Sequence, residues 1–262
     1  MADLTRTEVI KLIAIASKPL DLTGVNLEKV DLSGLNLSGA NLSRAVLIEA
    51  NLSYANCSDA NLQEANLSNA ELSKVELKQA NLSYAICTAA NLGRADLFCA
   101  NLSYAELNKT NLSFANCREV NFEGAELSKA NLEGAALKEA SLSHAVLKAA
   151  NLKYADLTNA KLKWANLSEA LLSNTHLSGA DLSLANLTKA KLSFTNLSDA
   201  NLSYANLSEA HLFFANLSRA ELKETNLSNA NCMEANFEEA DLSKANIEGA
   251  DFRKLNLDDY TE

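Results

Sequence analysis

Residues 196–215 read NLSDA NLSYA NLSEA HLFFA, and this five-residue unit decides the fold of the chain. Every position from 22 to 257 whose number leaves remainder two on division by five holds Leu, Phe, Cys or Ile, which makes 48 consecutive units in one frame. Two residues before each of these stands a small residue, which is Ala in 37 units. A period of five fits neither the 3.6-residue period of a helix nor the two-residue period of a strand. The backbone must therefore turn once in every unit.

The unit, Ala-Asn/Asp-Leu-Ser-X, resembles the repeat of the pentapeptide-repeat family over more than 90% of the chain. In that family four repeats make one square coil, and the central Leu or Phe and the small residue two before it point inward. The resemblance implies an all-β fold, a right-handed quadrilateral parallel β-helix of about 12 coils, roughly 58 Å long at about 4.8 Å between stacked strands. Leu alternating with Ala fits such an interior, because a narrow coil has room for a large side chain only beside a tiny one.

The segment before the repeats predicts a short helix that caps the first coil. Thr5 and Glu8 have the spacing of a capping box, and Pro19 ends the segment. We expect a helix over residues 5–17, whose apolar face would consist of Val9, Ile10, Leu12, Ile13 and Ala16. The chain then divides into a capping helix and linker (1–19), a β-helix (20–259) and a tail (260–262).

Composition and charge indicate which kinds of partner and which cellular compartment to expect. The formal net charge of −10 disfavours direct binding to nucleic acid, which needs an excess of Lys and Arg. The only apolar stretch near the start, residues 9–16, is interrupted by Lys11 and is too short to span a bilayer. We therefore expect a cytoplasmic protein without a membrane partner.

The residue types that carry chemistry do not form a constellation in this frame. Four of the five cysteines, Cys57, Cys87, Cys117 and Cys232, replace Leu at the inward position, and only Cys99 is outward. No two of the inward cysteines are 20 residues apart, so a disulfide or a thiolate metal site is not expected. The three histidines, at positions 144, 176 and 211, fall on different sides of the coil. The sequence predicts no catalytic, metal or cofactor site and no enzyme.

Outward aromatic residues occupy the variable position X, which directly precedes the small residue, on only two opposite sides of a four-unit coil. They are Tyr54, Tyr84, Tyr104, Phe114, Tyr154, Trp164, Phe194, Tyr204 and Phe214. Tyr84 is predicted to stack on Tyr104, and Phe194 on Phe214. Either these are ladders that one turn type permits, or they form a surface for a partner, with Tyr84, Tyr104, Trp164, Phe194 and Phe214 as the candidates.

One side of the coil collects acidic residues. It comprises positions that leave 16, 18 or 19 on division by 20, and it carries a net charge of −7. Its acids are Asp59, Glu76, Asp96, Glu119, Glu139, Asp156, Asp199, Glu238, Glu239, Asp258 and Asp259. Such a side either attracts basic partners at long range or serves solubility alone.

Two functions are compatible with these features. The first is a non-enzymatic protein-protein interaction rod, regulatory or scaffolding, that binds a partner of unknown identity through its outer faces. The second, implied by the family resemblance, is mimicry of DNA to bind and protect a type II topoisomerase such as gyrase. The resemblance also implies homodimer contact at the uncapped C-terminal coil, through Phe252, Leu255, Leu257 and Tyr260.

Overall fold

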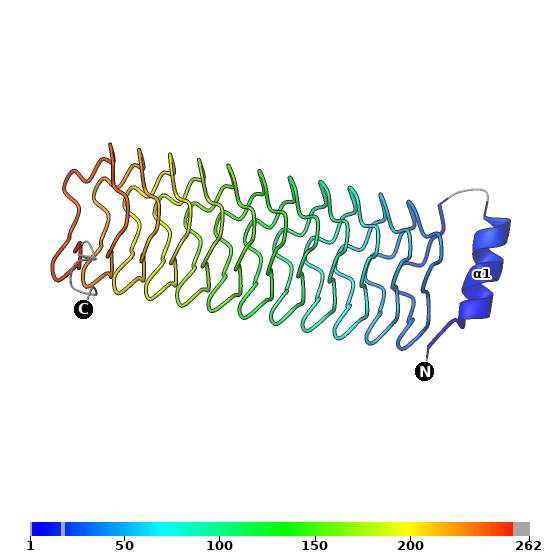
Figure 1. Ribbon diagram of the computed structural model, residues 1–262. Coiled ribbons are helices and arrows are strands. Elements are labelled where there is room, and N and C mark those ends of the chain that lie inside the picture. The colour runs from blue at the N-terminus through cyan, green and yellow to red at the C-terminus, as the bar shows by residue number, and fades with distance from the viewer. Residues whose placement is uncertain (1, 17–18, 254–262) are drawn as a thin grey trace, which may run out of the picture.

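A coil of 20 residues repeats through the molecule. The structure, a computed structural model, describes residues 2–16 and 19–253. In Figure 1 the coils stack into a long rod, and helix α1 (Arg6–Ile15) lies across its N-terminal end. Within the described ranges α1 is the only helix, and the β structure consists of single-residue bridges rather than longer strands.

Parallel bridges join each coil to the next and set the register. The first residue of each unit pairs with the residue 20 positions later, from Asp21 with Asn41 to Asn231 with Asp251. The second residue of the unit adds a short hydrogen bond to the next coil, as when the N–H of Leu22 donates to the carbonyl of Asn41 at 2.7 Å. A 20-residue register confirms four units per coil.

A tight turn closes each unit at its third and fourth residues. The N–H of the fifth residue donates to the carbonyl of the second, as Ala45 does to Leu42 at 3.0 Å. The fourth residue has a φ between 54° and 69° in every unit from 21 to 250, at 39 non-glycine residues and seven glycines. A positive φ at this place is what a type II turn requires. Val, Ile and Thr do not occur there, because β-branched side chains are strongly disfavoured in the left-handed region.

The second and fifth residues of the units point inward and form one continuous core. From Leu37 to Cys232, no residue at these positions is more than 2% exposed. Phe122 is accommodated among the leucines with no exposure at all. In the first coil Val25 and Leu35 stand where most later coils have Ala, and both are only half-buried, so the packing there differs from that of the later coils.

Four threonines replace Ala inside the core, and the hydroxyl group of each is hydrogen-bonded. They are Thr110, Thr175, Thr195 and Thr225. Each hydroxyl donates to a carbonyl 23 residues earlier, as Thr225 does to Leu202 at 2.7 Å. A buried hydroxyl with a partner avoids the large cost of an unpaired polar group, so the repeat tolerates Thr at this position.

Helix α1 begins at the predicted capping box. The N–H of Thr5 donates to the Glu8 carboxylate at 2.7 Å, and the N–H of Glu8 donates to the Thr5 hydroxyl at 3.4 Å. Val9 is fully buried against the first coil. Two residues of the expected apolar face do not belong to it, since Ile10 is 42% exposed and Ala16, the C-cap, is exposed. That part of the prediction was wrong because a helix of 10 residues presents only a narrow stripe to a flat coil.

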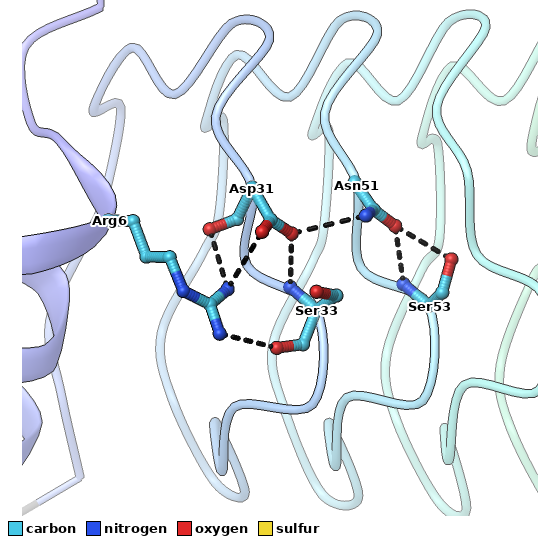
Figure 2. Close-up of polar contacts among 5 residues, drawn as sticks. All are labelled: Arg6, Asp31, Ser33, Asn51 and Ser53. Atoms are coloured by element: carbon cyan, nitrogen blue, oxygen red, sulfur yellow. Dashed lines mark hydrogen bonds and ion pairs between the residues drawn. The ribbon is translucent and has the colours of Figure 1, made fainter.

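Arg6 takes the place of a missing coil at the N-terminal end of the stack. Its Nη1 and Nη2 atoms donate to the carbonyls of Asp31 and Ser33, both at 2.9 Å. One coil further on, the equivalent carbonyls of Asn51 and Ser53 accept backbone N–H groups at 2.7 and 2.9 Å. Figure 2 shows the guanidinium spanning both acceptors, with the Asp31 carboxylate 3.3 Å from Nη1. A planar fork of donors thus substitutes for two backbone amides.

Candidate interaction surfaces

A ladder of Asn side chains covers the flat sides of the rod. The Oδ1 atom of the first residue accepts the N–H of the third residue of its unit, as Asn51 does from Ser53 at 3.0 Å. The amide nitrogen donates to the equivalent Asn of the preceding coil, as Asn61 does to Asn41 at 3.2 Å. Most units have Asn or Asp at the first position, and there these bonds close the turn and link many of the coils from outside. Departures from Asn or Asp at this position are therefore exceptions to a structural rule.

Exposed aromatic side chains occupy the fourth position of the unit in two opposite turn columns, where a turn column is a set of fourth residues 20 apart. All nine predicted aromatics lie there and are between 42% and 62% exposed. The Tyr84 column contains Tyr84, Tyr104, His144, Trp164 and Tyr204; the Phe194 column contains Tyr54, Phe114, Tyr154, Phe194 and Phe214. Their exposure is imposed by the turn, which directs every fourth side chain outward.

Two predicted stacks are confirmed. The rings of Tyr84 and Tyr104 lie 5.3 Å apart with a 10° interplanar angle, and those of Phe194 and Phe214 lie 5.4 Å apart with a 5° angle. Trp164 stacks on His144 at 6.4 Å, a contact that the sequence analysis did not foresee. Parallel rings on successive coils follow directly from the coil register.

Glycine makes room for two of the aromatic rings. Gly124 and Gly134 follow Tyr104 and Phe114 by one coil, and each lies beneath the ring. A Cβ atom on Gly124 would come within 2.5 Å of Tyr104 Cε1, and one on Gly134 within 2.6 Å of Phe114 Cε1. The position therefore needs glycine for the ring as well as for its positive φ.

The acidic side carries seven acids without an ion pair and two with one. Lys78 lies 3.2 Å from the Asp96 carboxylate, and Arg219 binds Asp199 through two nitrogens at 2.7 and 2.8 Å. No other described acid of this side has a cation within 4 Å; these are Asp59, Glu76, Glu119, Glu139, Asp156, Glu238 and Glu239. Asp258 and Asp259 lie outside the described residues. The side is thus acidic but partly neutralised.

Hydrogen bonds shift two carboxyl groups of this side. The hydrogen bond and charge of Arg219 lower the pKa of Asp199. Partial burial opposes ionisation of Asp156, but donors from Thr158, the hydroxyl at 2.6 Å and the N–H at 3.0 Å, outweigh it and lower the pKa of Asp156. Both groups therefore stay ionised at neutral pH.

The C-terminal end of the described rod exposes core positions. Phe252 is 39% exposed and Ile247 52% exposed. The ring of Phe252 lies 5.4 Å from that of Phe237, and both line an open hollow of about 540 Å³. The other predicted contact residues, Leu255, Leu257 and Tyr260, lie outside the described residues.

Comparison with known proteins identifies the family. The sequence profile described as Pentapeptide repeats (8 copies) matches overlapping stretches that together span residues 21–163 and 165–259. The chain belongs to the pentapeptide-repeat family. Its rod is accordingly a right-handed β-helix, as the sequence predicted.

Several solved pentapeptide-repeat structures resemble the chain. HetL, involved in heterocyst differentiation regulation in the cyanobacterium Nostoc sp. strain PCC 7120, is 31% identical over 94% of this chain and 96% of HetL, with a TM-score of 0.46. Rfr23 from the cyanobacterium Cyanothece 51142 is 33% identical over 39% of this chain and 63% of Rfr23, with a TM-score of 0.25. Full-length QnrB1, a plasmid-mediated fluoroquinolone resistance protein, is 15% identical over 88% of this chain and 93% of QnrB1, with a TM-score of 0.29. No curated protein sequence matches the chain.

The cysteines of this pentapeptide-repeat rod are placed as expected. Burial raises the pKa of the thiols of Cys57, Cys87 and Cys232 to about 12, and also raises that of Cys117. Cys99 is half-buried and its Sγ lies 3.6 Å from a Glu119 oxygen. Desolvation and the Glu119 charge raise the pKa of the Cys99 thiol, which makes it a poor nucleophile.

Other chemistry-bearing groups remain scattered. Across residues 2–16 and 19–253 no three His, Cys, Asp or Glu side chains come together as a group that could hold a metal ion. In the same ranges no helix is both long and apolar enough to cross a membrane.

Sequence reasoning missed one cluster on the Phe194 column. Phe213, at the third position of its unit, packs edge-on against Phe194 at 6.0 Å and against Phe214 at 4.6 Å. On the adjoining flat side, Leu171 and Lys191 interrupt the Asn ladder in successive coils. The break in the ladder was visible in the sequence, but its importance depends on the bonds that Asn normally makes.

Proposed function

We propose that this pentapeptide-repeat protein is a non-enzymatic protein-protein interaction rod, regulatory or scaffolding, that binds its partners through its outer faces. The observation that carries the proposal is the set of nine aromatic side chains on two opposite turn columns, each at least 42% exposed. Large exposed rings on a rigid backbone are typical of binding surfaces, because little conformational entropy is lost when they are covered.

Site-specific photo-crosslinking tests the proposal. A photoreactive phenylalanine analogue would replace Tyr84 or Phe194 and, as the matched control, exposed Asn69 in a turn column without aromatics. In cells that produce the protein, we expect crosslinks to a discrete protein from the two aromatic positions and none from position 69. Equal crosslinking from all three positions, or none from any, would contradict the proposal.

The acidic side favours a second candidate, a DNA mimic that binds a type II topoisomerase. Its seven net negative charges over roughly 58 Å amount to one per about 8 Å, against one per about 1.7 Å along duplex DNA. This net charge already includes Lys78 and Arg219, which pair with Asp96 and Asp199. This candidate therefore ranks second.

Inhibition of gyrase supercoiling distinguishes the two. The test variant carries Glu119→Lys and Glu139→Lys, two acids of this side without an ion pair. The control carries Glu49→Lys and Glu209→Lys, in a different turn column. Mimicry predicts inhibition by wild type and control but not by the test variant; inhibition that survives in the test variant, or is absent in wild type, removes this candidate.

Homodimer contact at the C-terminal coil also remains a proposal, supported by the exposure of Phe252 beside the hollow that it lines with Phe237. Sedimentation of wild type and of Phe252→Glu tests it. A dimer that becomes a monomer in the variant is expected, whereas a wild-type monomer at micromolar concentration would end the proposal.

A further inference from the structure

We propose that the cluster around Phe213 binds an acidic segment of a partner protein that also carries aromatic or aliphatic side chains. The cluster, called the Phe213 patch, consists of Leu171, Lys191, Phe194, His211, Phe213 and Phe214. The inference rests on the proposed function as an interaction rod, and it names one binding site and the chemistry of its partner.

The Asn ladder is interrupted beside the rings of the Phe213 patch. On this side of the rod Asn91, Asn111, Asn131 and Asn151 bond in succession, and in the next three coils Leu171, Lys191 and His211 take their place. The N–H groups of the third residues in those three units, Ser173, Ser193 and Phe213, have no side-chain acceptor of the kind that Asn provides. The fold loses three turn-closing bonds here. A longer break at Ile86, Glu106, Glu126 and Val146 on the adjoining side shows that the stack tolerates such losses, so this break indicates a binding surface only together with the rings and the cation beside it.

The three phenylalanines of the patch pack against one another. Phe194 and Phe214 stack in parallel at 5.4 Å, and Phe213 stands edge-on to both, at 85° and 81°. Phe194 is 53% exposed and Phe214 42%. Three rings that hold one another in place form a preorganised apolar anchor of the kind that dominates binding energy at interfaces.

The flat side next to the rings carries basic residues. The twelve outward positions of this side at the first, third and fourth places of four successive coils, from 151 to 214, include two Lys and one His but no Asp or Glu. The whole chain carries a net charge of −10. Lys191 and His211 are exposed on bridged coils next to the rings. Glu234 follows Phe214 by one coil, so the positive charge lies on the flat side that carries Lys191, where it favours carboxylates beside the apolar side chains of a partner.

The probe is a fluorescein-labelled 12-residue peptide in which Asp and Glu flank one Phe and one Leu; the comparison peptide has Asn and Gln in place of the acids. Binding is measured by fluorescence anisotropy with the full chain. We expect the acidic peptide to bind at least tenfold more tightly than the amide peptide, and raising the salt concentration from 50 to 500 mM to weaken it several-fold.

Two variants test the site without endangering the fold. The first, Leu171→Asn with Lys191→Asn and His211→Asn, restores the ladder and is expected to be at least as resistant to urea as wild type. The second, Phe213→Ser with Phe214→Asn, restores residue types that the repeat uses elsewhere. Each variant should raise the Kd of the acidic peptide at least tenfold. Tyr84→Asn, in the opposite turn column, should change that Kd less than twofold.

Three results would overturn the inference. These are equal affinity for the acidic and amide peptides, unchanged affinity in both patch variants, and a wild-type dimer that the patch variants convert to monomer, which would make a second copy the occupant. Crosslinks from Tyr84 together with a peptide that does not bind would leave the proposed function standing and remove this site. If the peptide binds but no position yields crosslinks in cells, the site stands and the proposed function is contradicted.

Discussion

Removal of the Arg6 side chain should loosen the first coil while leaving the rest of the rod intact. The guanidinium bonds two carbonyls that no other group of the described chain reaches, at 2.9 Å each, and pairs with the Asp31 carboxylate. Hydrogen bonds to a charged group contribute about 1.5–3 kcal/mol each when shielded. Arg6 is 38% exposed, so water recovers part of the loss, and we expect Arg6→Ala to cost about 1–3 kcal/mol locally.

Native-state hydrogen exchange measures this cost where it falls. The N–H groups of Leu32 and Gly34 hold the first coil on the second, through the carbonyls of Asn51 and Ser53. Because 1.4 kcal/mol is a factor of ten, a cost of about 1–3 kcal/mol should accelerate exchange of these two amides about 5- to 140-fold in Arg6→Ala. Amides of central coils should exchange at the wild-type rate, since each coil of a solenoid contacts only its neighbours.

Two further variants separate the fork of donors from its charge. Arg6→Lys keeps the charge near Asp31 but cannot span two carbonyls with a planar group, so it should show most of the loss. Arg44→Ala removes an exposed pair with Glu64 and should leave the unfolding free energy nearly unchanged, with no effect on the first coil. The reasoning is refuted if Arg6→Lys protects Leu32 and Gly34 as well as wild type does, or if Arg44→Ala exposes them equally.

Three other substitutions probe the turn, the outer shell and the core. Gly24→Ala, where a Cβ meets nothing within 4 Å, should lower the unfolding free energy in urea by the penalty for a left-handed non-glycine residue, about 1–2 kcal/mol. Gly124→Ala should lower it by more, because the added Cβ meets the Tyr104 ring. Equal losses in the two variants would show that the ring moves aside without cost. The folded-state pKa of Asp156 is lowered, so its contribution to stability is complete above the unfolded pKa of about 4 and is lost as pH falls through the lower folded value. Asp156→Asn should therefore flatten the decline in unfolding free energy between pH 5 and pH 2, and an unchanged slope would contradict this. Thr225→Val should cost about 1 kcal/mol by thermal unfolding, through loss of one buried hydroxyl bond, and a gain in stability would show that the bond contributes nothing.

The inward half of the sequence predicted the fold because its constraint is steric and identical in every coil. Leu37 and Ala40 could be assigned to the core from their spacing alone, and both are at most 2% exposed. The positive φ of the fourth residue, in contrast, was hidden by the variety of side chains there, which range from Gly34 to Trp164. Only the absence of β-branched residues signalled it.

The positions of the outward half were predictable, but only some of its interactions were. The Tyr84–Tyr104 stack followed from the 20-residue register, whereas the ion pair that neutralises Asp199 depends on how Arg219 leans along its column. The role of Arg6 could not be found in the repeat at all, because it compensates for the absence of a neighbouring coil. Long side chains choose among several acceptors, and sequence spacing does not fix that choice.

Turn geometry does not explain why the aromatics keep to two opposite columns. The backbone is the same in all four, as a φ of 57° at Tyr104 and 59° at Lys109 illustrates, so an aromatic ring would fit equally well in any of them. Stacking is not a sufficient reason either, since Tyr154 and Tyr204 have no ring contact among the described residues and remain 59% and 48% exposed. The turn does not require aromatic side chains in these columns, and ring packing does not stabilise all of them. Because exposing large apolar side chains is unfavourable, their presence favours a role outside the fold. The distribution of aromatics around the coil, rather than their number, is therefore the strongest argument that the two columns meet a partner.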